Sequence, residues 1–268
     1  MTSKHSDLCG VPTAMPRESL SSWLSRLALS QGESLPVIAR YCKIKLAPDL
    51  DLTTIKPHIR RMSLIAGIPL KTFSDAKKIF SSVLSIDKLG HTYLLFANSR
   101  PKYRFCPMCL KTDKDPYFRV EWRFKAWRLC PIHQCLLEDH CANCKTPVTL
   151  PLDMLNSGLK RSGIGSLSMC AHCSEFLTKV KPAFIDELID RRLSKQDHLL
   201  ITNSKALMAS FYFKKFKIDG FTKLYKLKSM KQVNKAKIFP WDEFTWTADS
   251  WRIHSKPDIP QQLESRQL

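Results

Sequence analysis

Eight residues between positions 106 and 173 have the types and the spacing of metal ligands. They come in four pairs, and two residues separate the ligands of each pair, so a tight turn can point both at one ion. The pairs are Cys106 with Cys109, Cys130 with His133, Cys141 with Cys144, and Cys170 with Cys173. Four consecutive pairs predict two structural Zn²⁺ ions, one held by three cysteines and a histidine and one by four cysteines.

The order in which the pairs combine is not fixed by their spacing. We favour two sites that close in sequence order, because the intervals within each site are then typical of zinc ribbons. A cross-braced arrangement, with the first pair joining the third, has the same spacings available. The remaining candidates in this segment, Cys135, His140 and His172, lie outside the pair spacing and are interpreted as bystanders, with His172 as an alternative ligand.

Catalytic roles for these cysteines fit the sequence less well. Four ligands fill a tetrahedral site, whereas catalytic zinc keeps one position open. A redox CxxC motif needs a surrounding βαβ pattern, and the sequence has none. It also has no Walker motif and no recognisable nucleophile and base, so we expect no enzymatic activity.

The charge of the chain points to a polyanionic partner. The 268 residues include 43 Lys and Arg against 24 Asp and Glu, a formal net charge of +19, and the excess is spread through the whole length. Such a field favours DNA or RNA. The sequence lacks a stretch long and apolar enough to cross a bilayer, and residues 1–17 lack the pattern of a signal peptide. We therefore expect a protein of the prokaryotic cytosol, where its ten cysteines stay reduced.

The segment before the metal ligands has the periodicity of helices. An apolar stripe with helical spacing follows Pro16 and ends before Gly32; it consists of Leu20, Trp23, Leu24, Leu27 and Ala28. Arg26 falls on the opposite face with Ser21, Ser22 and Ser25, so we expect that face to be exposed and Arg26 to contact a protein partner. A second helix is predicted over Leu35–Tyr41.

Two further helices flank Gly67. The first has Ile55, Ile59, Met62 and Ile65 on one side, and the second opens at Pro69 with Phe73, Ala76, Ile79 and Phe80 facing inward. The arrangement resembles a helix-turn-helix, whose second helix would present Lys71, Lys77 and Lys78 to DNA. The alternative is an ordinary helical hairpin with a solvated basic face.

The C-terminal third combines lysines with aromatic residues. After short strand-like runs at 117–122 and 126–129, helices are predicted over Ile185–Leu193 and from Ala206 onward. Ten lysines stand between positions 205 and 237 against one acid, Asp219. We expect these lysines to neutralise phosphates; the candidates are Lys214, Lys215, Lys217, Lys223, Lys226 and Lys228. The interleaved aromatics from Phe211 to Tyr225 could stack on bases, but we favour a buried helical stripe.

These observations predict an α+β chain that is mainly helical. The expected organisation is a helical, helix-turn-helix-like domain over 1–100, a tandem zinc-binding segment over 101–183, a basic helical domain over 184–240 and an extended arm over 241–268. The sequence leaves open whether the protein acts as a single copy or as a homodimer.

The order of these motifs resembles the TniQ family, which includes the TnsD-type target selectors. The run from Pro16 to Ala28, PRESLSSWLSRLA, is similar to the family's opening signature. The sequences FCPMC, YFRVEW, CPIH and LLEDHC then follow in the family's order, so the resemblance covers about residues 12 to 180. The resemblance implies that the same eight paired residues are the zinc ligands, and the last pair, Cys170 and Cys173, matches the family least closely.

The resemblance implies a non-catalytic adaptor that selects target sites for a transposon with an AAA+ regulator. Family members mark the insertion site and recruit that ATPase, which brings the transposase. Some bind DNA themselves, and others act with a CRISPR RNA-guided effector complex; the shortness of this chain favours the second kind. One alternative is a free-standing, sequence-specific zinc-containing DNA-binding regulator. Another is a nuclease or transposase with structural zinc, which would need an acidic metal site; the acids available are Asp113, Asp115, Glu121 and Asp153.

Overall fold

The computed structural model describes residues 8–53, 57–155, 165–184, 195–217 and 224–230. Helices dominate it, as predicted, and its strands are short. The helices are α1 (Leu20–Ser30), α2 (Leu35–Tyr41), α3 (Leu50–Thr53), α4 (Pro57–Ala66), α5 (Ser74–Ile86), α6 (Pro107–Thr112) and α8 (Lys195–Phe213), with 3₁₀ turns η1 (Val120–Arg123), η3 (Leu177–Lys179) and η4 (Leu227–Ser229). Three antiparallel two-stranded sheets join β1 (Phe96–Ala97) to β2 (Arg100–Pro101), β3 (Leu129–Cys130) to β4 (Cys135–Leu136), and β5 (Lys215–Lys217) to β6 (Leu224–Lys226).

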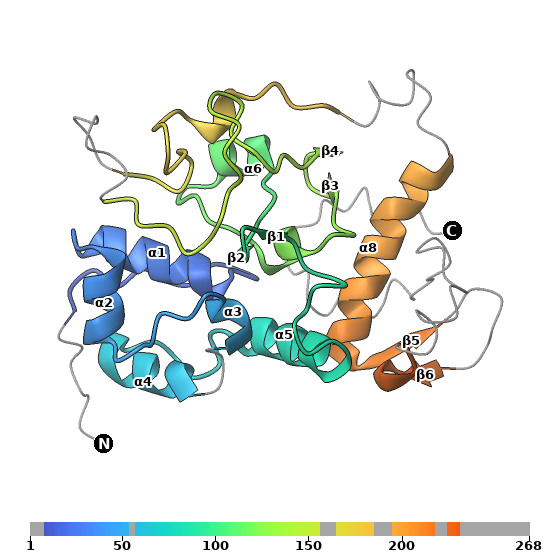
Figure 1. Ribbon diagram of the computed structural model, residues 1–268, viewed down its shortest axis with the longest axis horizontal. Coiled ribbons are helices and arrows are strands. Elements are labelled where there is room, and N and C mark those ends of the chain that lie inside the picture. The colour runs from blue at the N-terminus through green and yellow to red at the C-terminus, as the bar shows by residue number, and fades with distance from the viewer. Residues whose placement is uncertain (1–7, 54–56, 156–164, 185–194, 218–223, 231–268) are drawn as a thin grey trace.

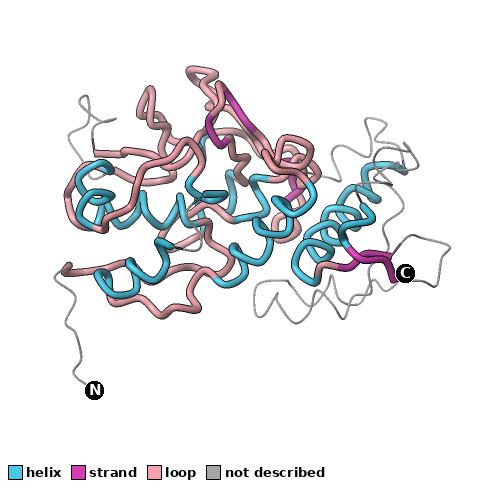
Figure 2. Tube along the Cα trace, turned by 60° about the horizontal axis from the view of Figure 1, so that its bottom comes forward, coloured by secondary structure: helices cyan, strands magenta, loops and turns pink. Residues whose placement is uncertain are grey.

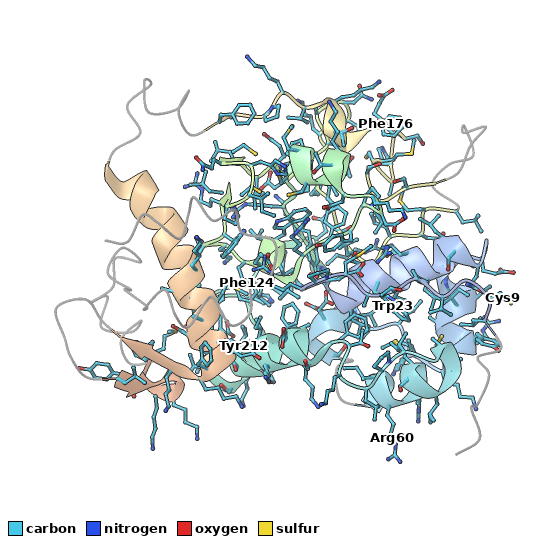
Figure 3. The ribbon with its side chains drawn as sticks, turned by 180° about the vertical axis from the view of Figure 1, so that it is seen from behind. Cys9, Trp23, Arg60, Phe124, Phe176 and Tyr212 are labelled. Atoms are coloured by element: carbon cyan, nitrogen blue, oxygen red, sulfur yellow. The ribbon has the colours of Figure 1, made fainter. Side chains whose placement is uncertain are left out.

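The five N-terminal helices form one side of the molecule, and the loop-rich segment that carries the cysteines covers α1 from the other side (Figure 1). Helix α8 lies at one end and packs against α5 (Figure 2). Buried apolar side chains from all three parts belong to one continuous core. In its centre Phe124 stacks on Phe80 of α5 and lies 5.5 Å, between ring centroids, from Phe211 of α8 (Figure 3).

Helix α1 begins and ends where the sequence predicts. Ser19 caps it by accepting the Ser22 N–H at 3.1 Å, which satisfies one of the free amides of the first turn. Gly32 follows with a φ of +62°, a left-handed conformation that suits the glycine after a helix. The predicted apolar stripe is buried, with Trp23 fully enclosed. Helix α2 has the predicted bounds, and the inward residues of α5 are buried as expected.

The opposite face of α1 is also buried, so the expectation of an exposed serine face is wrong. Ser21, Ser22 and Ser25 are each 0% exposed. The middle segment donates backbone amides to them: the Phe118 N–H bonds to Ser22 Oγ at 2.9 Å and the Leu152 N–H to Ser25 Oγ at 2.8 Å. These small hydroxyl side chains let a second segment approach the helix and satisfy its buried amides, which long charged side chains would prevent.

A buried ionic network fixes the same junction. Arg123 of η1 lies between Asp49 and Asp51, with nitrogen–oxygen distances of 2.5 and 3.8 Å. Asp51 also accepts the Tyr103 hydroxyl and, at 3.0 Å, the Ser21 N–H. Burial, and then the neighbouring Asp49, raise the pKa of Asp51 above its usual range. The network therefore joins the helical segment to the middle segment through buried charges, of which Arg123 and Asp51 are fully enclosed.

Two predicted elements take other forms. The strand-like run at 117–122 is extended only up to Arg119, which bridges to Glu18, and then turns into η1. The basic region is not helical throughout, because the chain leaves α8 at Lys214, with a φ of +58°, and forms the hairpin β5–β6. The predicted helix over 185–193 and the arm over 241–268 lie outside the described residues.

Candidate metal centres and basic surface

The structure gathers the eight paired residues into two groups in sequence order. Cys106, Cys109, Cys130 and His133 form the first cluster, and Cys141, Cys144, Cys170 and Cys173 the second; in each, the four ligand atoms lie within 4.8 Å of one another. The favoured sequential grouping is therefore the one adopted, and the cross-braced alternative is not. Among the described residues these are the only groups of three or more Cys, His, Asp or Glu with ligand atoms so close.

Different elements place the ligands of the first cluster. Cys106 caps helix α6, where its sulfur accepts the Cys109 N–H at 3.3 Å, so the first turn of the helix points both thiols inward. Strand β3 carries Cys130, and the turn that follows brings in His133. His133 Nδ1 lies 3.5 Å from Cys106 Sγ, 3.3 Å from Cys109 Sγ and 3.7 Å from Cys130 Sγ.

The other three pairs share one local structure. In each, the residue after the second ligand has a positive φ: +48° at Gln134, +58° at Lys145 and +69° at Ser174. The amide of that residue donates to the carbonyl of the first ligand of its pair, at 2.9, 2.9 and 3.0 Å. This tight turn explains why two intervening residues suffice to bring both ligand atoms to one point.

The distances between ligand atoms suit a tetrahedral metal ion. With metal–sulfur bonds of about 2.3 Å and metal–nitrogen bonds of about 2.0–2.1 Å, the edges of the tetrahedron are about 3.6–3.8 Å. Cys109 and Cys130 lie 3.6 Å apart, and in the second cluster the Cys141–Cys173 and Cys144–Cys170 sulfurs are also 3.6 Å apart. Both donor sets therefore fit a structural site with four protein ligands.

The three residues interpreted as packed or exposed bystanders lie outside both groups of four ligand atoms, in different surroundings. Cys135 is fully buried, and its sulfur lies 3.5 Å from Cys106 Sγ, beside the first cluster. His140 instead contacts Asp139 with its side chain 45% exposed, and His172 is exposed in the turn of the second cluster. Cys135 lies beside the first cluster because it pairs with Cys130 across the β3–β4 hairpin, and the spacing of the ligands does not reveal that hairpin.

Arg26 is not on an outer surface, so its prediction as a partner-binding residue is wrong. Its side chain is 10% exposed and pairs with Glu18 at 2.8 Å, with a further bond to the Thr13 carbonyl at 3.2 Å. Glu18 is itself buried and also accepts the Ser22 hydroxyl at 2.8 Å. Burial raises the pKa of Glu18 to about 7, against the opposing effect of Arg26.

The lysines predicted to contact nucleic acid come from two places that adjoin in space. Lys78 of α5 donates to the Tyr212 hydroxyl of α8 at 2.6 Å and lies over the Tyr212 ring. Tyr212 (Figure 3) precedes Lys214 by two residues in the chain. Lys77 is exposed on α5, and Lys71 is exposed in the turn before that helix rather than within it. No observation distinguishes a DNA-reading helix from an ordinary hairpin at α4 and α5, so the helix-turn-helix stays a prediction.

The hairpin β5–β6 separates its lysines from its aromatics. Phe216 and Tyr225 are cross-strand partners whose rings stack at 5.5 Å, with Phe216 fully buried. Phe211 is buried on α8, so the predicted helical stripe is confirmed for it, whereas Phe216 is buried on strand β5 and is not helical. The exposed lysines of this region are Lys214, Lys215, Lys226 and Lys228; Lys223 and the side chain of Lys217 lie outside the described residues.

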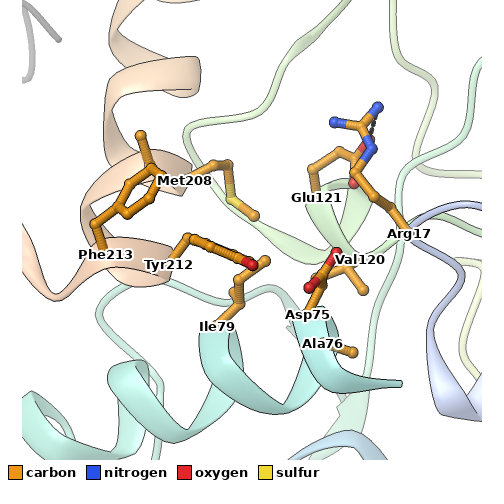
Figure 4. A pocket seen from close by; sticks show the side chains of 10 residues that line it. Arg17, Asp75, Ala76, Ile79, Val120, Glu121, Met208, Tyr212 and Phe213 are labelled. Carbon is orange, nitrogen blue, oxygen red and sulfur yellow. Dashed lines mark ion pairs between the residues drawn. The ribbon is translucent and has the colours of Figure 1, made fainter. Parts of the chain in front are cut away.

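The acids that a nuclease would need are engaged elsewhere. Asp113 forms two 3.1 Å bonds to Arg119, and Glu121 pairs with Arg17 at 2.9 Å. Glu121 and Asp75 line a pocket between α5, α8 and η1, whose remaining walls include Met208, Tyr212 and Phe213 (Figure 4). Within the described residues no three acids come together, so this pocket does not have the ligands of a two-metal nuclease site.

Comparison with known proteins yields one family. The family model described as TniQ matches residues 10–137, a range that contains α1 to α6 and the whole first cluster but ends before the second. No curated protein matches the chain. None of the described helices is long and apolar enough to cross a membrane.

Proposed function

Since the chain carries a TniQ family domain over residues 10–137, which implies a role in choosing transposition target sites, we propose that it is the non-catalytic adaptor that joins a marked target to an AAA+ regulator. The family match carries this proposal. The mark is either target DNA itself or a guide-RNA effector complex bound to it. Two groups of four ligand atoms and the exposed apolar and basic side chains of the described residues support the proposal.

The metal ions of this adaptor are two Zn²⁺, both structural. Each cluster supplies four ligands at tetrahedral spacing and leaves no position for substrate. Zinc would fix the loops of the middle segment, whose regular secondary structure is short. Elemental analysis of chelator-free protein should find two zinc ions per chain, and a value of one or none would contradict this assignment.

The surface for the ATPase is proposed to lie on helices α2 and α4. Val37 and Tyr41, one turn apart on α2, are 43% and 42% exposed, and Leu64 of α4 is 57% exposed. Arg61 of α4 donates to the Lys43 carbonyl just after α2 at 3.2 Å, an exposed bond between the ends of the two helices. Exposed apolar side chains grouped on neighbouring helices are typical of a protein interface.

A pull-down with the AAA+ regulator of the same transposon tests this surface. Replacing Val37 and Tyr41 with aspartate and alanine should abolish capture without unfolding the protein, because surface changes cost little stability. Leu89→Ala is the matched control, since Leu89 is 66% exposed but lies beyond the end of α5. Equal capture of all three proteins would remove α2 from the proposed interface.

The nucleic-acid surface is proposed to be the lysine cluster of α5 and the β5–β6 hairpin. Lys215 and Lys226 are direct cross-strand partners, and like charges placed opposite each other destabilise a hairpin unless an anion lies between them. Among the described residues, no acid forms an ion pair with either lysine. A phosphate backbone would supply the missing charge.

The salt dependence of DNA binding tests this assignment. Each phosphate contact lowers log affinity by about 0.9 per unit of log salt. The double variant Lys215→Gln, Lys226→Gln should therefore flatten the slope by about 1.8, whereas replacing the exposed Lys88 and Lys111 should leave it unchanged. An unchanged slope in the hairpin variant would place the phosphate contacts elsewhere. Tight binding of the isolated protein to one sequence would instead favour the free-standing regulator.

A further inference from the structure

Beside the three cysteines of the first cluster lies a fourth buried sulfur, which the four-ligand assignment does not use. Cys135 is 0% exposed, and its Sγ lies 3.5 Å from Cys106 Sγ, the same distance that separates Cys106 Sγ from His133 Nδ1. Both values are close to the edge of a tetrahedron around zinc, about 3.6–3.8 Å. The Cys135 thiol therefore has the spacing of a ligand to Cys106 alone, whereas His133 Nδ1 lies within 3.7 Å of all three cluster sulfurs.

The hairpin β3–β4 explains why Cys135 faces the cluster. Cys130 and Cys135 are Cα partners in this antiparallel pair, and side chains directly opposite each other project on the same side of the hairpin. Cys130 belongs to the first cluster, so Cys135 projects from the same side of the hairpin and its sulfur reaches Cys106. The intervening turn, which ends in the left-handed residue Gln134, carries His133 between them.

The two candidates differ in their access to water. His133 is half-buried and, with Cys109, lines an open pocket that also involves Asp113, Lys114 and Asp115. Cys135 is enclosed by protein and is not part of that pocket's lining. His133 is therefore the ligand that a solvent molecule or a competing group can reach, while Cys135 stays buried beside Cys106.

We propose that Cys135 is a reserve ligand, which replaces His133 at the metal of the first cluster and converts a Cys₃His site into a Cys₄ site. After this exchange Cys106, Cys109, Cys130 and Cys135 would hold the metal through four thiolates, and the thiol proton of Cys135 would pass to the freed imidazole of His133. The ion keeps four protein ligands throughout, and the fold of the middle segment survives the loss of His133. This proposal rests on the metal sites proposed above.

Cobalt(II) titration of the full chain tests the exchange, because the intensity of the thiolate-to-cobalt charge-transfer band grows with the number of bound thiolates. The wild-type protein should bind two cobalt ions through seven thiolates. His133→Ala should still bind two, with a band stronger by one thiolate in seven. Cys135→Ser should match the wild type, and the double variant should keep only the ion of the second cluster.

Two controls make the outcomes distinct. His172→Ala removes an exposed histidine beside the second cluster and should leave the band unchanged. The second cluster also serves as an internal standard for folding in every variant. Loss of one ion from His133→Ala alone, or a band no stronger than that of the wild type, would overturn the reserve-ligand proposal. Failure of the wild type to bind cobalt would instead refute the metal sites themselves.

Discussion

The junction between α1 and the middle segment makes a quantitative prediction at Ser25. Its hydroxyl accepts the Leu152 N–H at 2.8 Å and donates to the Ser21 carbonyl at 2.8 Å. Ser25 and Leu152 are both buried. Ser25→Ala removes the acceptor and adds no bulk, so the Leu152 amide is left buried without a partner. An unsatisfied buried donor costs about 1–3 kcal/mol.

A matched serine isolates that cost. Ser82 of α5 is equally buried and donates to the Lys78 carbonyl four residues earlier at 2.7 Å, but no amide of another segment donates to it in the described structure. Ser82→Ala therefore removes the same intrahelical bond without leaving an amide unpaired. The difference between the two variants should be about 1–3 kcal/mol in the free energy of unfolding, with Ser25→Ala the less stable.

Thermal and urea unfolding at a fixed excess of zinc measure this difference, since metal occupancy then stays constant. For a chain of this size, 1 kcal/mol shifts the melting temperature by about 2–4 °C. Equal destabilisation by Ser25→Ala and Ser82→Ala would refute the view that the serine face of α1 binds the middle segment. It would also weaken the conclusion that the helical and cysteine-rich segments share one core.

Three further predictions follow from other parts of the structure. Arg123→Met should destabilise the protein by about 3–5 kcal/mol in urea unfolding, because it leaves Asp51 buried without its ion pair. Chelation of zinc, or Cys130→Ser, should remove near-ultraviolet circular dichroism of the middle segment, since ligand loss releases the turns that zinc fixes. The raised pKa of Glu18, about 7, means that the folded state holds an extra proton between the ordinary carboxyl pKa and neutrality, so stability should fall as pH rises through that interval. The Glu18→Gln variant cannot titrate at this position, so its free energy of unfolding should lack this part of the pH dependence. If wild type and variant showed the same dependence of stability on pH, Glu18 would be ionised in the folded protein.

Regular spacing made much of the fold predictable. Helical periodicity locates α1, α2 and α5, because each of these helices buries an apolar stripe against the same core. The two-residue spacing of the ligand pairs locates both clusters, because each later pair forms the same local turn. These signals are short in range, and each is complete within one segment of the chain.

The features that sequence analysis missed depend on contacts between distant segments. The serine face of α1 has the composition of a polar surface, and only the amides of Phe118 and Leu152 turn it into an interface. The run Lys215–Lys217 alternates like a strand but is too short to be distinguished from the end of α8. Cys135 gains its place beside the first cluster through cross-strand pairing with Cys130.

The central claim is that this chain directs insertion to a target, and sequencing of insertion positions in cells tests it most directly. The transposon is mobilised with its own transposase, AAA+ regulator and targeting complex, with and without this protein. We predict that insertions at the target site require the protein and are restored by the wild-type gene. Targeted insertion that persists at the same frequency after deletion of the gene would contradict the adaptor function.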